Sequence, residues 1–200
     1  MTLLPPSFFL RNDVVQIARE LLGKKIITRF DGVTTSGIIS ETEAYAGVTD
    51  RASHAYGGRR TARTEVMYAA GGTAYVYLCY GMHSLFNIVT NEAGIPHAVL
   101  IRGIIPLEGT EIMLQRTGKT KFIRDSGIGP GKVSKLLGIH YSHSGLLLNQ
   151  AYHPGNYSIS LEETGTGASP GKITTCPRVG VDYAGADALL PYRFILQRNN

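Results

Sequence analysis

Two glutamates and a tyrosine alternate with small residues along one short stretch of the chain, residues 39–45. Successive side chains of a strand point to opposite faces, so Glu41, Glu43 and Tyr45 share one face at intervals of about 6.6 Å. A carboxylate such as Glu43 that stays ionised beside an arginine can orient or deprotonate a water molecule. Acids are mostly exposed in proteins, so two solvent-facing acids on an exposed strand are the competing interpretation.

The same two acids suggest a second possible reaction, hydrolysis of a sugar polymer. In that reaction two carboxyl groups about 5–9 Å from each other flank the glycosidic bond. Glu41 and Glu43 would stand side by side on one strand instead of across a substrate. The formal charge of +5 also suits a polyanion more than a neutral glycan. Carbohydrate hydrolysis is therefore the weaker hypothesis.

Three tyrosines lie within six residues in the segment 71–83, and the last of them precedes a glycine. Tyr75 and Tyr77 share one face of the expected strand, whereas Tyr80 stands where Gly81 can adopt a left-handed conformation and reverse the chain. The pattern predicts a strand that ends in a hairpin with a large ring at its tip. For any single tyrosine of a strand, packing is the more common role.

A glycine-rich turn at residues 127–132 precedes an expected helix with Lys132 at its start. The turn lacks the spacing of a Walker A loop and of a dinucleotide fingerprint, so no nucleotide cofactor is indicated. Its backbone N–H groups and the helix dipole can hold a DNA phosphate, and a plain helix start is an equal alternative. The Gly-Ile-Gly-Pro sequence also has local similarity to a helix-hairpin-helix phosphate clamp.

The histidines do not have the spacing of metal ligands. His54 stands out because glycines and arginines surround it in a loop, residues 46–63. The remaining histidines are scattered and are expected to be surface or core residues: His83, His97, His140, His143 and His153.

These residues need helices and strands that position them, and hydrophobic periodicity and turn signals predict such elements. Asn12 is expected to cap the first helix, and Asp31-Gly32 to close the first hairpin. The expected helices cover residues 13–22, 110–116 and 132–137, with a helical turn near 64–69. The expected strands cover residues 25–29, 33–45, the tyrosine segment with 84–90, 98–104, 157–162 and 192–196.

The composition is that of a turn-rich α+β protein with one domain over residues 1–200. The 200 residues include 24 glycines and 9 prolines, and no repeat or linker marks a second domain. Cys79 and Cys176 fit neither a disulfide framework nor a zinc site, so both are expected to be buried thiols in a reducing compartment. Neither a signal peptide nor an apolar run of about 20 residues is evident, which favours a cytoplasmic protein over a membrane protein.

A set of short motifs follows along the chain in a fixed order. They are ARELLG at 18–23, ETEAY at 41–45, His54 with GGR at 57–59, GTAYVY at 72–77, YGM at 80–82, NI at 87–88, LIR at 100–102, PLEG at 106–109, GPGK at 129–132 and PRVGV at 177–181. In this order they resemble the alkyladenine (3-methyladenine) DNA glycosylase family. Each motif is modest alone, whereas their order and spacing are highly specific over nearly the whole chain.

The resemblance implies an α+β fold with a single compact domain: a mostly antiparallel curved β-sheet, surrounding helices and a protruding β-hairpin that carries a DNA-intercalating tyrosine. It implies a DNA repair glycosylase that flips alkylated or deaminated purines out of the duplex, of the 3-methyladenine, hypoxanthine and ethenoadenine type. Hydrolysis of the N-glycosidic bond would then initiate base excision repair. The expected partner is double-stranded DNA containing a damaged purine, bound by a monomer without cofactor or metal.

The resemblance also assigns roles to individual residues. Glu43 is the expected general base, with Arg102 holding it ionised and helping to orient the water. The base pocket is expected to comprise Tyr45, His54, Tyr77, Asn87, Leu100 and Val179. Tyr80 is the expected wedge that fills the vacated stack, with Met67 and Met82 beside it. Phosphate contacts are expected from Arg59, Arg60, Arg63 and Lys132.

Two alternatives to this assignment stay open. A non-catalytic DNA damage-binding protein would keep the pocket and the wedge without turnover. His83 stands where relatives can carry tyrosine, and a weaker stacking group beside the wedge could alter lesion preference or have no effect.

No lysine lies in the matching catalytic motifs to form a Schiff base, so the resemblance implies a monofunctional enzyme that leaves an abasic strand.

Overall fold

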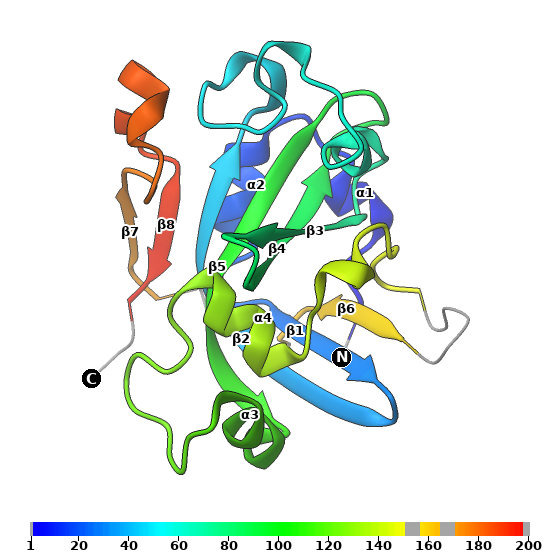
Figure 1. The fold of residues 1–200 in the computed structure, drawn as a ribbon, viewed down its shortest axis with the longest axis vertical. Helices are drawn as coiled ribbons and strands as arrows, with labels where there is room; N and C mark the ends of the chain where they lie inside the picture. Colours follow the sequence, from blue (N-terminus) through cyan, green and yellow to red (C-terminus); the bar gives the residue numbers. More distant parts are fainter. Residues whose placement is uncertain (1, 151–156, 165–170, 198–200) are drawn as a thin grey trace.

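An antiparallel β-sheet organises the molecule, and eight strands of the described residues belong to it (Figure 1). The computed structural model describes residues 2–150, 157–164 and 171–197. The strands are β1 (Lys25–Phe30), β2 (Val33–Tyr45), β3 (Ala74–Cys79), β4 (His83–Thr90), β5 (His97–Glu108), β6 (Ser158–Glu162), β7 (Ile173–Cys176) and β8 (Arg193–Leu196). The main path runs in the order β3-β4-β5-β2-β1-β6, and β8 pairs with both β2 and β7.

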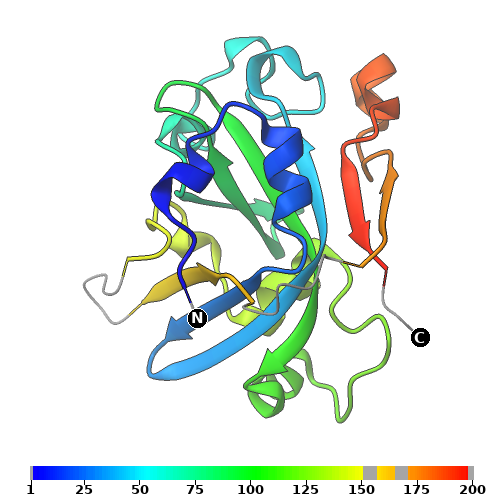
Figure 2. The same ribbon diagram turned by 180° about the vertical axis from the view of Figure 1, so that it is seen from behind.

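Short helices pack around this sheet, and Figure 2 shows the first two of them lying over it. The α-helices are α1 (Pro6–Phe9), α2 (Val14–Glu20), α3 (Thr110–Thr117) and α4 (Pro130–Leu137). The 3-10 turns are η1 (Gly47–Thr49), η2 (Tyr56–Gly58), η3 (Glu65–Tyr68), η4 (Tyr141–His143) and η5 (Asp182–Leu189). Helices and an antiparallel sheet that follow one another in this way confirm the expected α+β class.

Local signals place the first helix and the first hairpin, with one correction. The Asp13 carboxylate accepts a hydrogen bond from the backbone N–H of Gln16 at 2.9 Å, so Asp13 caps α2 and the predicted cap, Asn12, is wrong. Asp13 stands directly before the first helical residue, from where its short side chain reaches a free N–H group of the first turn. Asp31 and Gly32 close the β1–β2 hairpin with φ of 52° and 78°, as predicted.

The tyrosine segment forms a second hairpin. β3 and β4 pair antiparallel as far as Cys79 and His83, so residues 80–82 form the tip. Gly81 has the expected left-handed φ of 69°, and Tyr80 is also left-handed with φ of 51°. A left-handed backbone costs a residue with a Cβ atom about 1–2 kcal/mol. Tyr80 is 89 % exposed at the tip.

The strand register decides which side chains share a face of the sheet. Residues directly opposite each other in neighbouring strands point to the same face. One such row crosses β3, β4, β5 and β2 and consists of Tyr75, Asn87, Leu100 and Glu43. The sheet therefore aligns residues that are up to 57 positions apart in the sequence, counted from 43 to 100, on one face.

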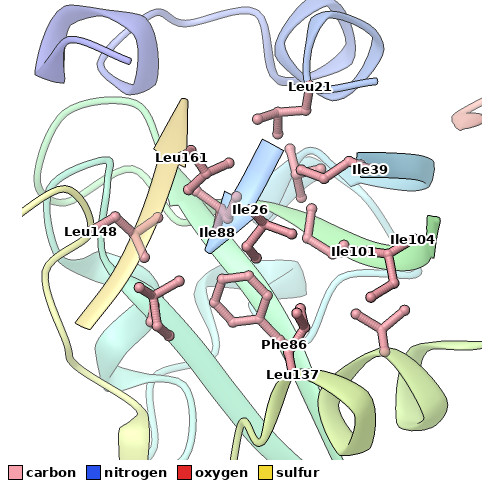
Figure 3. Packing of buried hydrophobic residues seen from close by; sticks show 14 of the residues in the cluster. Leu21, Ile26, Ile39, Phe86, Ile88, Ile101, Ile104, Leu137, Leu148 and Leu161 are labelled. Carbon is pink, nitrogen blue, oxygen red and sulfur yellow. The ribbon is translucent and has the colours of Figure 1, made fainter. Parts of the chain in front are cut away.

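The alternate residues of the same strands face the other way and form the main hydrophobic core with the helices. Figure 3 shows Phe86 and Ile88 of β4 and Ile101 of β5 packed with Leu21, directly after α2, and Leu137 of α4. All five side chains are buried. Because strand side chains alternate, burying this face in the core leaves the row with Glu43 on the opposite face.

The structure differs from the expected elements at several boundaries: α2 is shorter at both ends than the predicted residues 13–22, and α1 was not predicted. β5 is longer at both ends than the predicted residues 98–104, α4 begins at Pro130 instead of residue 132, and β7 was not predicted. Proline is favoured in the first turn of a helix, where its missing N–H is not needed. β7 has four residues, too few for a periodic pattern, and it forms through pairing with β8.

The two cysteines are less buried than the sequence predicts. Cys79 and Cys176 are free thiols and are half-buried, so the prediction that both are buried is wrong. Each is the last residue of its strand, at the margin of the sheet.

In the described part of the chain, no helix has the length and apolar character that a membrane span requires.

Candidate active site

A cavity of about 440 Å³ opens on the face of the sheet that carries the row of Glu43. Its volume is within the range of small-molecule sites. The lining comes from β2 to β5, from the loop after β2 and from residues 179–183. All six residues predicted for the base pocket line it: Tyr45, His54, Tyr77, Asn87, Leu100 and Val179. The fold thus brings these residues together, and their role in binding a base stays a prediction.

Glu43 lies directly behind the wall of this cavity and is 0 % exposed. Its Oε1 accepts a hydrogen bond from the backbone N–H of Val179 at 2.8 Å, and its Oε2 accepts one from the Tyr45 hydroxyl at 2.8 Å. The Arg102 Nε lies 3.3 Å from Oε1. The carboxylate is therefore held by three groups that themselves line the cavity.

Glu41 is also buried, between two arginines. Its Oε1 accepts hydrogen bonds from Arg102 Nε at 3.0 Å and from Arg193 Nε at 2.7 Å. The interpretation of Glu41 and Glu43 as solvent-facing acids is therefore wrong. At these positions β2 is an interior strand, because β5 pairs with one edge and β8 with the other.

The environment of Glu43 raises the pKa of its carboxyl group. Burial is the largest cause, and Arg102, the Val179 N–H and the Tyr45 hydroxyl oppose it in that order. The predicted pairing with Arg102 is present, but the cost of burying the charge exceeds the effect of the arginine. A carboxylate with a raised pKa is a stronger base once it is ionised, which suits proton abstraction.

Aromatic rings form the walls of the cavity. The His54 and Tyr77 rings meet edge to face, with centroids 4.7 Å apart and an interplanar angle of 77°. The Arg63 guanidinium lies over the Tyr77 ring at 4.6 Å from its centroid. Tyr45 also lines the cavity, next to Glu43. Such walls are suited to a flat ring, in particular an electron-poor one.

His54 is neutral in this environment. Burial, helped by Arg63 and Arg59, lowers its pKa to about 4. The Nδ1 atom lies 2.9 Å from the Tyr75 hydroxyl, and Arg63 Nη2 lies 3.4 Å from Nε2. Because a guanidinium can only donate, Nε2 accepts and the ring proton resides on Nδ1, facing Tyr75.

Lowering the pH is expected to destabilise the unmodified protein more than it destabilises a His54→Asn variant. The unfolded chain binds a proton at residue 54 below about pH 6.5, whereas the folded chain does so only near the lowered value of about 4. The stability that neutral His54 contributes is thus complete above pH 6.5 and lost as the pH falls toward 4. Urea midpoints of both proteins at pH 7.5, 6.5, 5.5 and 4.5 measure this; parallel pH dependences would contradict it.

The predicted wedge residues separate into two groups. Tyr80 and Met82 are exposed at the hairpin tip, where they can meet another molecule. Met67 is 2 % exposed and packs in a buried cluster with Tyr75 and Val89, so it is not exposed at the tip as Met82 is, and its place beside the wedge stays a prediction. The 3-10 turn η3 turns this side chain inward, where it lines the cavity.

The four predicted phosphate-binding residues are all exposed. Arg60 is already paired with Glu65, at 2.6 Å between Nη2 and Oε1. Lys132 lies in the first turn of α4, beside Gly131, where a Cβ atom would be 3.2 Å from the Cβ of His83. The start of α4 thus lies against the base of the tyrosine hairpin. Contact of these residues with phosphate stays a prediction.

Residues near the cavity that the sequence interpretation missed are Asp50, Arg178 and Tyr183. Arg178 and Asp50 form a buried ion pair behind the cavity wall. Tyr183 is exposed at the cavity lining, and its hydroxyl donates to the backbone oxygen of Ala52 at 3.1 Å. Arg178 belongs to the PRVGV motif, but nothing in the local pattern indicates a partner 128 positions away.

Metal ligation has no support in the residues that the structure describes. None of their histidine, cysteine, aspartate and glutamate side chains gather in threes or more to hold an ion. His153, one of the scattered histidines, lies outside the described residues.

The fold and the cavity define a class of protein: an α+β protein whose pocket has aromatic walls beside a buried, arginine-paired carboxylate. A model of the methylpurine-DNA glycosylase (MPG) family matches residues 7–200. The chain belongs to this family. It is accordingly a DNA glycosylase, a hydrolase that acts on DNA in repair.

Bacterial relatives that carry 3-methyladenine DNA glycosylase in their names are similar over nearly the full length. A protein of Chlamydia felis is 47 % identical over 197 residues, which cover 97 % of this chain and 96 % of the relative. A protein of Chlamydia abortus is 46 % identical, with 99 % and 100 % covered. A protein of Bacillus cereus strain B4264 is 44 % identical, with 95 % and 93 % covered. The family resemblance inferred from the motifs is thus confirmed.

Proposed function

We propose that the protein flips alkylated or deaminated purines out of double-stranded DNA and hydrolyses their N-glycosidic bond. The proposed substrates are of the 3-methyladenine, hypoxanthine and ethenoadenine type. The observation that carries the proposal is the burial of Glu43 behind an aromatic-walled cavity, in contact with Arg102. A base in this cavity would bring its glycosidic bond toward a carboxylate whose pKa is raised.

Flipping requires a pocket for the base and a group that fills the space it leaves. Unstacking costs a few kcal/mol and least for damaged or mispaired bases, which contributes to selectivity. Tyr80, exposed at the hairpin tip, is proposed to enter the stack, with Met82 beside it. The extruded base would lie between Tyr45 on one side and His54 with Tyr77 on the other.

Asn87 and Leu100 are proposed to shape the floor of the pocket. The Asn87 amide donates to the backbone oxygens of Tyr75 and Leu85, at 3.1 and 3.2 Å. Because both hydrogen atoms of the Asn87 NH₂ group are engaged in this way, the side chain is held in one orientation. Its oxygen is then directed away from these two backbone oxygens. A rigid Asn87 would crowd a guanine-type exocyclic amine and so favour adenine-type lesions.

The proposed chemistry is a displacement by water at the deoxyribose C1′. Glu43 takes a proton from the water as the O–C1′ bond forms, and the C1′–N bond breaks with its electron pair leaving on the base. Arg102 would help to orient the water, and the backbone oxygen of Val179 would be a third contact. No lysine is among the described residues that line the cavity, which supports a monofunctional enzyme without a Schiff base.

Binding to the DNA backbone is proposed to use Arg59, Arg60, Arg63 and Lys132. Each phosphate contact releases counterions, so affinity would fall steeply with salt. We propose that residues 1–200 act as one domain, as a monomer in the cytoplasm, and that one copy engages one lesion. Neither a metal nor a cofactor takes part in the proposed step.

A panel of 25-mer duplexes with a single lesion each tests this proposal. The free base and the alkali-labile abasic strand are measured for hypoxanthine, ethenoadenine, 3-methyladenine and undamaged adenine. Release from at least one lesion duplex, with the strand intact before alkali, is expected. Lesion binding without any released base would instead support the damage-binding alternative, and cleavage before alkali would overturn the monofunctional assignment.

A further inference from the structure

Arg178 and Asp50 form an ion pair in which both side chains are almost fully buried, 0 % and 2 % exposed. The pairing is bidentate: Nη1 contacts Oδ2 at 2.5 Å and Nη2 contacts Oδ1 at 2.8 Å. The same guanidinium donates to the backbone oxygens of Ala44 at 2.9 Å and Asp187 at 3.1 Å. One side chain thus connects β2, the loop after it and η5.

This guanidinium lies next to two of the three groups that hold Glu43. Its central carbon is 4.9 Å from the centroid of the Tyr45 ring, whose hydroxyl donates to Glu43. The following residue, Val179, donates its backbone N–H to the same carboxylate. A shift of Arg178 would therefore move both hydrogen-bond donors of Glu43 together.

The energetics of the Arg178–Asp50 pair favour a role in positioning neighbouring groups over a role in stabilising the fold. Removing two ions from water costs about as much as their attraction returns, so a buried ion pair is a weak source of stability. A bidentate arginine–carboxylate pair, however, fixes the guanidinium plane in both distance and angle. Catalysis is sensitive to such placement, since a displacement of about 1 Å can cost 10²-fold in rate.

We infer that Arg178 is a positioning residue for the catalytic carboxylate, holding the Tyr45 ring and the Val179 N–H against Glu43. The inference deepens the proposed function and rests on it. The other groups that face Glu43 are Arg102 from β5, Arg193 from β8 and Glu41 on β2 itself. None of these contacts depends on Arg178. The Arg178 guanidinium also acts on Glu43 through its charge, so a substitution that keeps this charge isolates the effect on the two hydrogen bonds.

The test compares single-turnover rates of base release across pH 4.5–8.5, with enzyme saturating, for the unmodified protein and for Arg178→Lys. Saturation removes the effect of a smaller folded fraction. Lysine keeps the charge but cannot form the bidentate pair. Both hydrogen bonds lower the pKa of Glu43, so loosening them is expected to move the acid limb to higher pH. The plateau rate is expected to fall about 10-fold or more.

Two further variants distinguish positioning from folding. Asp50→Asn removes the bidentate partner of Arg178 with little change in shape and is expected to lower the plateau rate as Arg178→Lys does. Arg116→Met is the matched control, because the Arg116 guanidinium also holds a backbone oxygen, that of Leu136 at 2.9 Å, between α3 and α4. It is expected to lower Tm and leave the acid limb in place.

The outcomes separate the inference from the proposed function. If Arg178→Lys lowers only Tm, with rate and acid limb unchanged as for Arg116→Met, the pair is structural and the inference is wrong. Failure of both Arg178→Lys and Asp50→Asn to fold at 4 °C would overturn it in the same way. If the unmodified protein releases no base from any lesion duplex, the proposed function itself fails.

Discussion

Glu43→Gln is expected to slow base release by about 10²–10⁴-fold, the usual contribution of a general base. The amide cannot take a proton from water, but it fills the same space behind the cavity wall. Its oxygen can still accept from the Val179 N–H, and the Tyr45 hydroxyl can turn to accept from its NH₂ group. Single-turnover assays on a hypoxanthine duplex measure the rate, and a filter-binding assay shows that the lesion is still bound.

Loss of activity in Glu43→Gln should not come from loss of the fold. Burial raises the pKa of Glu43, so the folded chain disfavours the charged form. Stability contributed by the neutral form is therefore lost as the pH rises through that pKa, and Gln avoids this loss. Tm at pH 8 is expected to be at least as high as that of the unmodified protein. Glu163→Gln, at a surface pair with Lys24, is the control and should leave the rate unchanged; an unchanged rate in Glu43→Gln would exclude Glu43 as the base.

Tyr80→Ala is expected to lower the rate of excision from stable, base-paired lesions by about 10- to 100-fold, because stacking of one aromatic ring on a base is worth about 1–3 kcal/mol. The ring is almost fully exposed at the hairpin tip, so little packing is lost with it. Surface substitutions of this kind change the free energy of unfolding by about 0.5 kcal/mol at most. Stopped-flow fluorescence of a 2-aminopurine next to the lesion reports flipping directly.

Tyr80→Phe is the matched variant for the wedge. It keeps the ring and removes only the hydroxyl, so flipping and excision are expected to stay close to those of the unmodified protein. A lesion base that has no pairing partner in the opposite strand needs less free energy to leave the stack. Its excision should therefore depend less on Tyr80. A fall in Tm of Tyr80→Ala by more than a few degrees would instead assign the ring to packing.

Local sequence signals were sufficient where the structure depends on neighbouring residues. Asp31-Gly32 and Gly81 tolerate a positive φ, and both hairpins close where these residues stand. Alternation along β2 places Glu41 and Glu43 on one face, as period two requires. The local errors are small: the helix cap moves by one residue from Asn12 to Asp13, and α4 begins two residues before the expected start.

The pairing of distant strands decided what the local pattern left open. The sequence could not distinguish exposed acids from buried ones, because the exposure of Glu43 depends on β5 and β8, which pair with the two edges of β2. The same holds for Met67, which a 3-10 turn directs into a buried cluster.

The sequence by itself determined the family, the two hairpins and the residue types from which a glycosylase site can be built. Only the tertiary structure decided that Glu43 is buried with a raised pKa and that Arg178 meets Asp50 behind it. The physical reason is that backbone turns and side-chain alternation are local properties. The desolvation of Glu43 and the buried ion pairs depend on contacts between residues far apart in the sequence, such as 50 and 178.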